Sequence, residues 1–254
     1  MWLLFLLPAF LVTSLSALRL CRLVAATDVS WAPRPEPLPE RVDLYEAAYL
    51  AGGPERVVDL TLVTMAEHGR LHLAHTGWTT VVEASARTEL ERAALEAIGP
   101  EGQCPTSELR AALASGPTVQ QLAGRLAAAG LAVPKALRED VAAAVAAVRR
   151  AGLTTLALLA AALCTVGRGD GAAAPLLAWF ALPLVLAGGT LALARIELYP
   201  VTRWAAPNGQ ALLRALRPRR TVRSTDLLLA VAVAGLSAVS DRRLRVALRP
   251  RRAL

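Results

Sequence analysis

The sequence predicts a mainly α-helical membrane protein, with three transmembrane helices and a cytoplasmic α+β region of one or two winged-helix-like units. Hydrophobic residues make up 55% of the 254-residue chain, and the excess lies in a few long stretches without charged side chains. Such stretches are typical of membrane-spanning helices. Between the first and second stretches, short amphipathic patterns alternate with glycines and brief apolar runs, which favours a small α+β domain there.

The first transmembrane helix is predicted over residues 1–18, which contain no charged side chain. A cleaved signal peptide is the alternative, because this run contains a Ser-Leu-Ser-Ala sequence that resembles a cleavage site. Signal peptides begin with a basic segment, however, whereas here Arg19 and Arg22 follow the apolar run. We therefore expect a retained anchor. Residues 19–40 then form a proline-rich juxtamembrane linker, extended over Trp31–Pro39.

A first winged-helix-like unit is predicted over residues 41–85. A short helix over Val42–Leu50 is closed by a Gly-Gly pair. Pro54 then suits the first turn of the next helix, because its missing N–H would have no helical partner there. The apolar stripe of that second helix indicates one face toward a core. Two short strands are expected to follow, around a turn at residues 75–77.

A second helical or winged-helix-like unit is predicted over residues 86–150. Thr88 is a suitable N-cap for the next helix, and Glu91 stands three residues on, as a capping box requires. A further helix is expected after Thr106. An alanine-rich helix begins at Pro134 and is expected to continue up to the membrane.

A transmembrane hairpin is predicted over residues 151–196. Residues 151–167 and 172–194 are two uncharged runs, and only four residues separate them. Two long apolar helices joined by so short a polar connection are typical of a membrane hairpin. A buried hairpin in a water-soluble protein is the alternative, and it would need a large partner surface around both helices.

The orientation follows from the positively charged residues, which favour the cytoplasmic side. The arginines that flank the apolar runs lie next to the same side of the predicted membrane: Arg19, Arg22, Arg149, Arg150, Arg195 and Arg203. We therefore expect a multi-pass protein of the cell membrane, with its N-terminus outside and its main soluble region and C-terminus in the cytoplasm.

Residues 197–254 are predicted to form a basic cytoplasmic tail, with 12 basic and 3 acidic side chains, net +9. Its apolar stretch at 227–239 is shorter than the ~17–25 residues of a membrane span, so we expect a buried or interfacial helix, with a fourth span as the alternative. Basic side chains next to a membrane attract anionic lipids. The tail residues that we expect to contact lipid headgroups are Arg217, Arg219, Arg220 and Arg223.

One motif resembles a known family. Residues 48–57 read AYLAGGPERV, which is similar to the A-x-L-A-G-G-P-x-R-V signature of a large uncharacterised family of actinobacterial membrane proteins. The resemblance covers most of the chain, although many members end in glycine- and cysteine-rich repeats that are lacking here. It implies a similar domain and topology, and no activity. The motif residues expected to take part in an interaction are Tyr45, Leu50, Gly52, Gly53, Pro54, Arg56 and Val57.

No catalytic, cofactor-binding or metal-binding constellation is predicted. His72 and His75 point to opposite faces of a strand and lack a completing ligand, and Gly52-Gly53-Pro54 lacks the lysine of a P-loop. Arg56 is a candidate for binding an anion, or for pairing with Glu46 or Asp59.

The distribution of charge also limits the classes of partner that the chain is expected to bind. Residues 19–150 carry 14 basic and 16 acidic side chains, net −2, so nucleic-acid binding is disfavoured. The apolar runs lack the ionisable residues that transport requires. We therefore expect a membrane-anchored protein-interaction module, with membrane lipids and a protein as partners. The alternative is a subunit of an enzyme or transporter whose active site needs another chain.

Overall fold

The structure, a computed structural model, describes residues 3–30, 43–165, 173–198, 204–216, 224–239, 245 and 247–248. Within these residues the chain is mainly helical, with three helices long and apolar enough to span a membrane and one three-stranded sheet. This confirms the broad fold class predicted from the sequence. The predicted Trp31–Pro39 linker, the loop of the hairpin and the arginine cluster at 217–223 lie outside the described residues.

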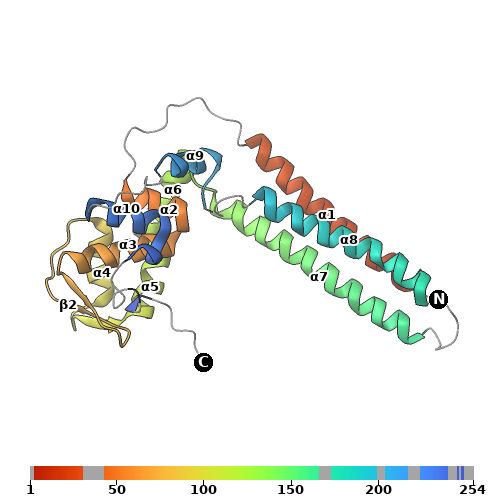
Figure 1. The fold of residues 1–254 in the computed structure, drawn as a ribbon, viewed down its shortest axis with the longest axis horizontal. Helices are drawn as coiled ribbons and strands as arrows, with labels where there is room; N and C mark the ends of the chain where they lie inside the picture. The colour runs from red at the N-terminus through yellow and green to blue at the C-terminus, as the bar shows by residue number, and fades with distance from the viewer. Residues whose placement is uncertain are drawn as a thin grey trace. The chain divides into compact units, whose positions relative to one another are not determined.

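The chain forms two compact units (Figure 1). Unit 1 comprises residues 1–32 and 135–201, and unit 2 comprises residues 33–134 and 202–254. Unit 1 contains three long helices, and each includes a window of at least 18 residues with the hydropathy of a membrane span. They are α1 (Leu3–Ser30), α7 (Lys135–Thr165) and α8 (Ala173–Leu198).

The helices of unit 1 pack through two layers of mainly small side chains. Leu20 of α1 lies in one layer with Ala144 and Val148 of α7 and with Ala187 and Ala194 of α8. The other layer contains Ala9, Ala162, Leu176 and Phe180. Since the order along α7 is opposite to that along α1 and α8, the chain passes up, down and up. Small residues let helix backbones approach closely, as in membrane bundles.

The outer surface of unit 1 is apolar over residues 5–18, 151–164 and 175–194. Among the described residues, every exposed large hydrophobic side chain other than Trp78 and Val82 belongs to α1, α7 or α8. The buried threonine hydroxyls of the bundle donate hydrogen bonds to backbone carbonyls of their own helices. The Thr155 hydroxyl donates to the Ala151 carbonyl at 2.9 Å, and the Thr13 hydroxyl donates to the Ala9 carbonyl. Such an apolar exterior suits a hydrocarbon environment.

One helix of unit 1 is longer than the sequence predicted, and another begins in the segment that was assigned to the second soluble unit. Helix α1 continues to Ser30, so residues 19–30, which were assigned to the linker, are helical. Helix α7 is continuous from Lys135 to Thr165, so the alanine-rich end of the predicted second unit belongs to unit 1. Charged residues ended both predicted spans, but arginine, alanine and leucine are good helix formers and do not interrupt a helix.

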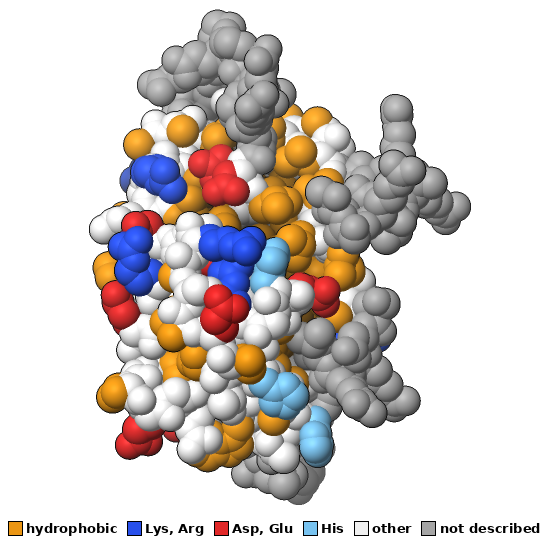
Figure 2. Space-filling view, turned by 90° about the vertical axis from the view of Figure 1, so that its left-hand side faces the viewer, with side chains coloured by type: hydrophobic (Ala, Val, Ile, Leu, Met, Phe, Trp, Pro, Cys, Tyr) orange, Lys and Arg blue, Asp and Glu red, His pale blue; other side chains and the backbone are white. Residues whose placement is uncertain are grey.

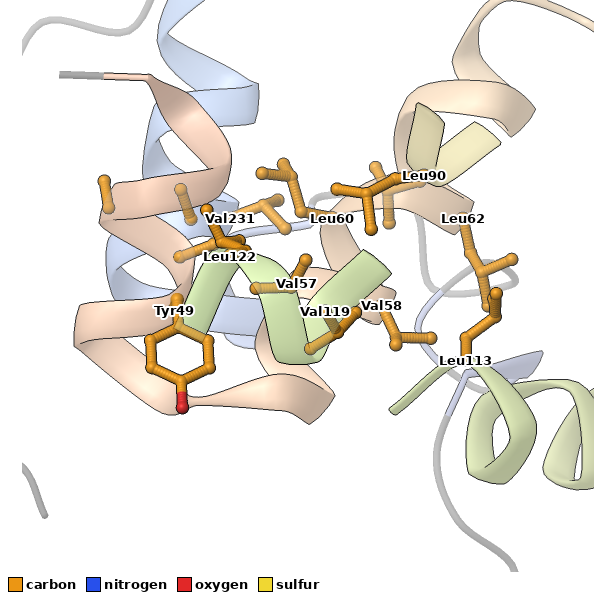
Figure 3. Close-up of a cluster of buried hydrophobic side chains, with 14 of the residues drawn as sticks. Tyr49, Val57, Val58, Leu60, Leu62, Leu90, Leu113, Val119, Leu122 and Val231 are labelled. Atoms are coloured by element: carbon orange, nitrogen blue, oxygen red, sulfur yellow. The ribbon is translucent and has the colours of Figure 1, made fainter. Parts of the chain in front are cut away.

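Unit 2 is built around α3, whose side chains are buried on nearly every side (Figure 3). Val57, Val58, Leu60 and Leu62 from this helix meet apolar residues of the surrounding helices, among them Leu113. Hydrophobic burial of this kind is the main stabilising term of a small domain. The elements before the spanning hairpin are α2 (Leu44–Gly52), α3 (Pro54–Glu67), β1 (Leu71–Leu73), β2 (Trp78–Val81), α4 (Glu89–Ile98), β3 (Gln103–Pro105), α5 (Thr106–Ser115) and α6 (Pro117–Ala128).

The sheet has the order β1-β2-β3 and is antiparallel throughout. Strands β1 and β2 form the predicted hairpin, with His72 opposite Thr80. Strand β3, which the sequence analysis did not anticipate, pairs with β2 so that Thr79 lies opposite Cys104. The sheet therefore crosses the boundary that the sequence placed between residues 85 and 86, and the two predicted units share one core.

Part of the predicted tail completes unit 2. It contains α9 (Pro207–Leu216), α10 (Ser224–Ala234) and the 3₁₀ helix η1 (Gly235–Ala238). Val231 and Ala232 are fully buried in the same cluster as α3, so the apolar helix is buried, one of the two places that the sequence predicted for it. Before α9, an isolated bridge pairs Ala132 with Ala205. The described part of residues 204–248 is thus integral to the domain rather than a separate extension.

Candidate functional site

The Gly-Gly-Pro motif forms the turn between α2 and α3. Gly53 has φ 74° and ψ −159°, a combination open to glycine alone among the common residues. Its N–H donates to the Tyr49 carbonyl at 2.7 Å, and its own carbonyl accepts from the N–H groups of Arg56 and Val57. Pro54 occupies the first turn of α3, as the sequence predicted. The turn ends one helix and begins the next without an intervening loop.

Trp204 closes over this turn. A Cβ atom added to Gly53 would lie 2.1 Å from Trp204 Cε2, so the indole ring rests directly on the glycine. The ring also meets Tyr49 edge to face, with centroids 5.6 Å apart and planes at 69°. Through these contacts the motif holds Trp204, from the C-terminal segment of unit 2, against the helix pair α2–α3 of the N-terminal segment.

Arg56 makes a second connection of the same kind. Its Nη1 donates to the Val231 carbonyl at 3.4 Å, in the last turn of α10, where carbonyl groups lack helical partners. Gly235 has φ 81°, which favours glycine, and the guanidinium of Arg56 lies where a Cβ on this residue would be. Burial lowers the pKa of Arg56, and the charge of Asp59 opposes that shift. The hydrogen-bond partner is a carbonyl, where the sequence had suggested an anion, Glu46 or Asp59.

The remaining motif residues divide between the core and the surface. Leu50 and Val57 have no exposed side chain, whereas Tyr45, Gly52 and Pro54 are partly exposed. Burial raises the pKa of Tyr45, and a hydrogen bond with Thr88 opposes that rise. The motif as a whole acts as a structural joint, and little of it is accessible to a partner.

A buried ion pair joins Arg70, the residue before β1, to Glu91 of α4. Arg70 Nη1 lies 2.5 Å from Glu91 Oε2, and both side chains are only 2% exposed. The same Oε2 accepts the Arg87 N–H at 2.6 Å, while the Thr88 hydroxyl accepts the Glu91 N–H at 3.2 Å. Thr88 thus caps α4 as predicted, but the Glu91 carboxylate turns to Arg70 and Arg87 because an ion pair with a buried guanidinium is the stronger interaction.

An open cavity of about 460 Å³ lies beside the β1–β2 turn and helix α5. Its walls combine apolar side chains with hydroxyl groups and one guanidinium. Its lining residues include Trp78, Thr106, Ser107, Arg110, Ala111 and Leu248. We call it the Trp78–Arg110 pocket. Sequence analysis did not identify it, because its walls come from four separate segments of the chain, at residues 55, 76–78, 105–114 and 247–248.

Arg110 connects this pocket to the core. Its Nη1 lies 2.7 Å from Asp59 Oδ1 and also donates to the Leu248 carbonyl. Burial raises the pKa of Asp59 to about 6, and the charges of Arg110 and Arg56 oppose that rise. The Thr106 hydroxyl is engaged with that of Thr79 at 2.8 Å. The pocket therefore offers the exposed Trp78 ring and the Ser107 hydroxyl, beside the Glu55 carboxylate and a guanidinium that is already paired with Asp59.

The histidines lie apart from this pocket. His68 Nδ1 is 2.7 Å from the Thr64 carbonyl, His72 lies in β1, and His75 lies in the turn. Within the part of the chain that the structure describes, no three His, Cys, Asp or Glu side chains are grouped to hold a metal ion. On the face shown in Figure 2, acidic and basic side chains are interspersed rather than segregated.

The fold defines a helical protein with three candidate membrane spans and a compact α+β unit that is discontinuous in sequence. Comparison with protein-family models, with curated proteins and with solved structures finds no match for this chain. The resemblance to the actinobacterial membrane protein family therefore stays a prediction.

Proposed function

We propose that this chain is a multi-pass protein of the cell membrane whose unit 2 binds a protein partner in the cytoplasm through the Trp78–Arg110 pocket. The pocket is the observation that carries the proposal. Trp78 is 47% exposed and Val82 is 66% exposed, and no other large hydrophobic side chain in the described part of unit 2 is exposed. Tryptophan and arginine are enriched at the energetically dominant positions of protein interfaces.

The proposed sidedness is supported by charge and by chain topology. Arg19, Arg22, Arg149 and Arg150 flank the same packing layer of unit 1, and positive residues favour the cytoplasmic side. The two segments of unit 2 share one core, so they must lie on the same side of a membrane. Two crossings between them, by α7 and α8, satisfy that condition.

As part of this proposal, we infer that unit 2 is winged-helix-like. The β1–β2 hairpin would act as the wing, beside α4, α5 and α6, with β3 as the strand that joins the wing to these helices.

Photo-crosslinking in native membranes tests the proposal. A photoreactive phenylalanine analogue replaces Trp78 in one full-length variant and Ala111 in another, since both line the pocket. Glu96 on α4 is exposed outside the pocket and gives the matched control. We expect the two pocket variants to yield the same discrete protein adduct, and the Glu96 variant to yield none. Equal adducts at all three positions, or none at the two pocket positions, would refute the pocket as the binding site.

A further inference from the structure

Four exposed arginines lie at one level of unit 1, two on α1 and two on α7. Arg19 and Arg22 on α1 flank Leu20, and Arg149 and Arg150 on α7 follow Val148 directly. Because Leu20 and Val148 pack in the same layer, the four guanidinium groups start from backbone positions within about one helical turn of that layer. We call this set the arginine girdle.

The girdle lies where the surface of unit 1 changes from uncharged and apolar to charged. On one side of it, the described helical residues 3–18, 151–165 and 173–194 contain no charged side chain and expose leucines. On the other side, α7 carries the exposed Glu139 and Asp140. A bundle that crosses a bilayer places such a boundary among the lipid headgroups.

No carboxylate neutralises the girdle within the described part of the chain, where no ion pair includes any of its four arginines. Arg150 Nε is 3.4 Å from the Ala146 carbonyl of its own helix. Glu139 and Asp140 lie about 14 Å or more along α7 from Arg149, at ~1.5 Å per residue. Guanidinium groups near hydrocarbon need an anionic partner, and their planar donor pattern matches phosphate oxygens.

We propose that the arginine girdle binds the phosphate groups of anionic phospholipids in preference to zwitterionic ones. This inference rests on unit 1 spanning a bilayer and is independent of the pocket in unit 2. It also differs from the lipid contact predicted for the arginines at 217–223, because the girdle is held on packed helices. An Arg near a membrane surface contributes roughly fivefold to anionic-lipid affinity, so we expect the girdle to supply at least about tenfold.

The test compares three full-length proteins in neutral detergent by native mass spectrometry. The girdle variant carries Arg19→Gln, Arg22→Gln, Arg149→Gln and Arg150→Gln. The control variant loses the same charge from exposed positions of unit 2, through Arg87→Gln, Arg92→Gln, Arg125→Gln and Arg214→Gln. Each protein is titrated with dioleoyl phosphatidylglycerol and dioleoyl phosphatidylcholine. We expect the wild-type chain and the control to prefer phosphatidylglycerol, and the girdle variant to lose at least tenfold of that preference.

Three results would overturn the proposal. Equal binding of the two lipids by the wild-type chain would remove the preference itself. An equal loss in the control variant would show that net charge, rather than the girdle, attracts the lipid. Competition by inorganic phosphate at the lipid's own concentration would show a general anion site. If the girdle variant does not fold, the Arg19/Arg22 and Arg149/Arg150 double variants decide the question, each with a loss of at least about threefold expected, since two such losses multiply to tenfold.

Discussion

Substitution of Gly53 by alanine should destabilise unit 2 by two separable effects. The first is the backbone, because φ 74° with ψ −159° is strained for any L side chain and costs ~1–3 kcal/mol. The second is overlap with Trp204, whose ring would lie 2.1 Å from the new Cβ; overpacking of this kind costs another ~1–3 kcal/mol. The sum, about 2–6 kcal/mol, is a large part of the ~5–15 kcal/mol of a typical domain.

Gly69 provides the matched control for the backbone effect. It also has a positive φ, 71°, but a Cβ there would meet nothing within 4 Å. Gly69→Ala should therefore cost only the ~1–2 kcal/mol of a left-handed conformation. In a Trp204→Ala background, Gly53→Ala should lose its steric effect and keep its backbone effect. The double-mutant cycle should accordingly give a coupling of about 1–3 kcal/mol.

The assay is hydrogen exchange of the α3 amides in the full-length protein, because the slowest of these report opening of the whole unit. Mass spectrometry of peptides from 54–67 gives the change in opening free energy for each variant. If Gly53→Ala costs no more than Gly69→Ala, or if the cycle shows no coupling, the indole ring does not rest on this turn and the motif is not the joint described above.

Three further predictions concern the ion pairs and the membrane. Glu91→Gln should leave the buried guanidinium of Arg70 without a counter-charge and lower the free energy of unfolding by about 3–5 kcal/mol. Glu89→Gln removes the exposed pair with Arg92 and should change that free energy by less than ~1 kcal/mol. Thermal unfolding of the two variants measures the difference. The pKa of the Asp59 carboxyl is about 6 in the folded unit, above its ordinary value of 3.8, so the folded unit binds the carboxyl proton more tightly than the unfolded chain does. The stability that this proton contributes is complete below pH 3.8 and is lost as the pH rises through about 6. Unfolding titrations should show that Asp59→Asn removes this pH dependence, whose slope is up to ~1.4 kcal/mol per pH unit, and an unchanged slope would contradict the raised pKa. After carbonate extraction the full-length chain should stay in the membrane pellet, and its release into the supernatant would exclude the proposed spans.

The features that the sequence predicted correctly are encoded locally. The candidate spans follow from uninterrupted apolar composition, and the turn before α3 follows from Gly53 and Pro54 within a few residues of each other. Thr88 identified the start of α4 for the same reason. Each of these signals operates over one or two helical turns, where chain connectivity already brings the interacting groups together.

The features that sequence analysis missed depend on segments far apart in the chain. Arg56 donates to a carbonyl 175 residues away, and nothing in the local pattern distinguishes that partner from Asp59. The pocket needs Trp78, Arg110 and Leu248 together. Strand β3 is only three residues long and is stabilised by its pairing with β2. Periodicity carries no information about such pairings, which tertiary packing decides.

The discontinuity of unit 2 has a consequence for biosynthesis. When the ribosome has completed residue 134, α3 still lacks Val231 and the turn at Gly53 still lacks Trp204. If α7 and α8 span the membrane as proposed, the hairpin then enters the translocation machinery before α9 and α10 emerge. Until they do, the nascent domain presents an unfilled apolar face, the kind of surface that chaperones recognise. In the proposed topology, a chain in which only one helix of the hairpin crosses would place α9 and α10 across the membrane from α3 and leave this core incomplete.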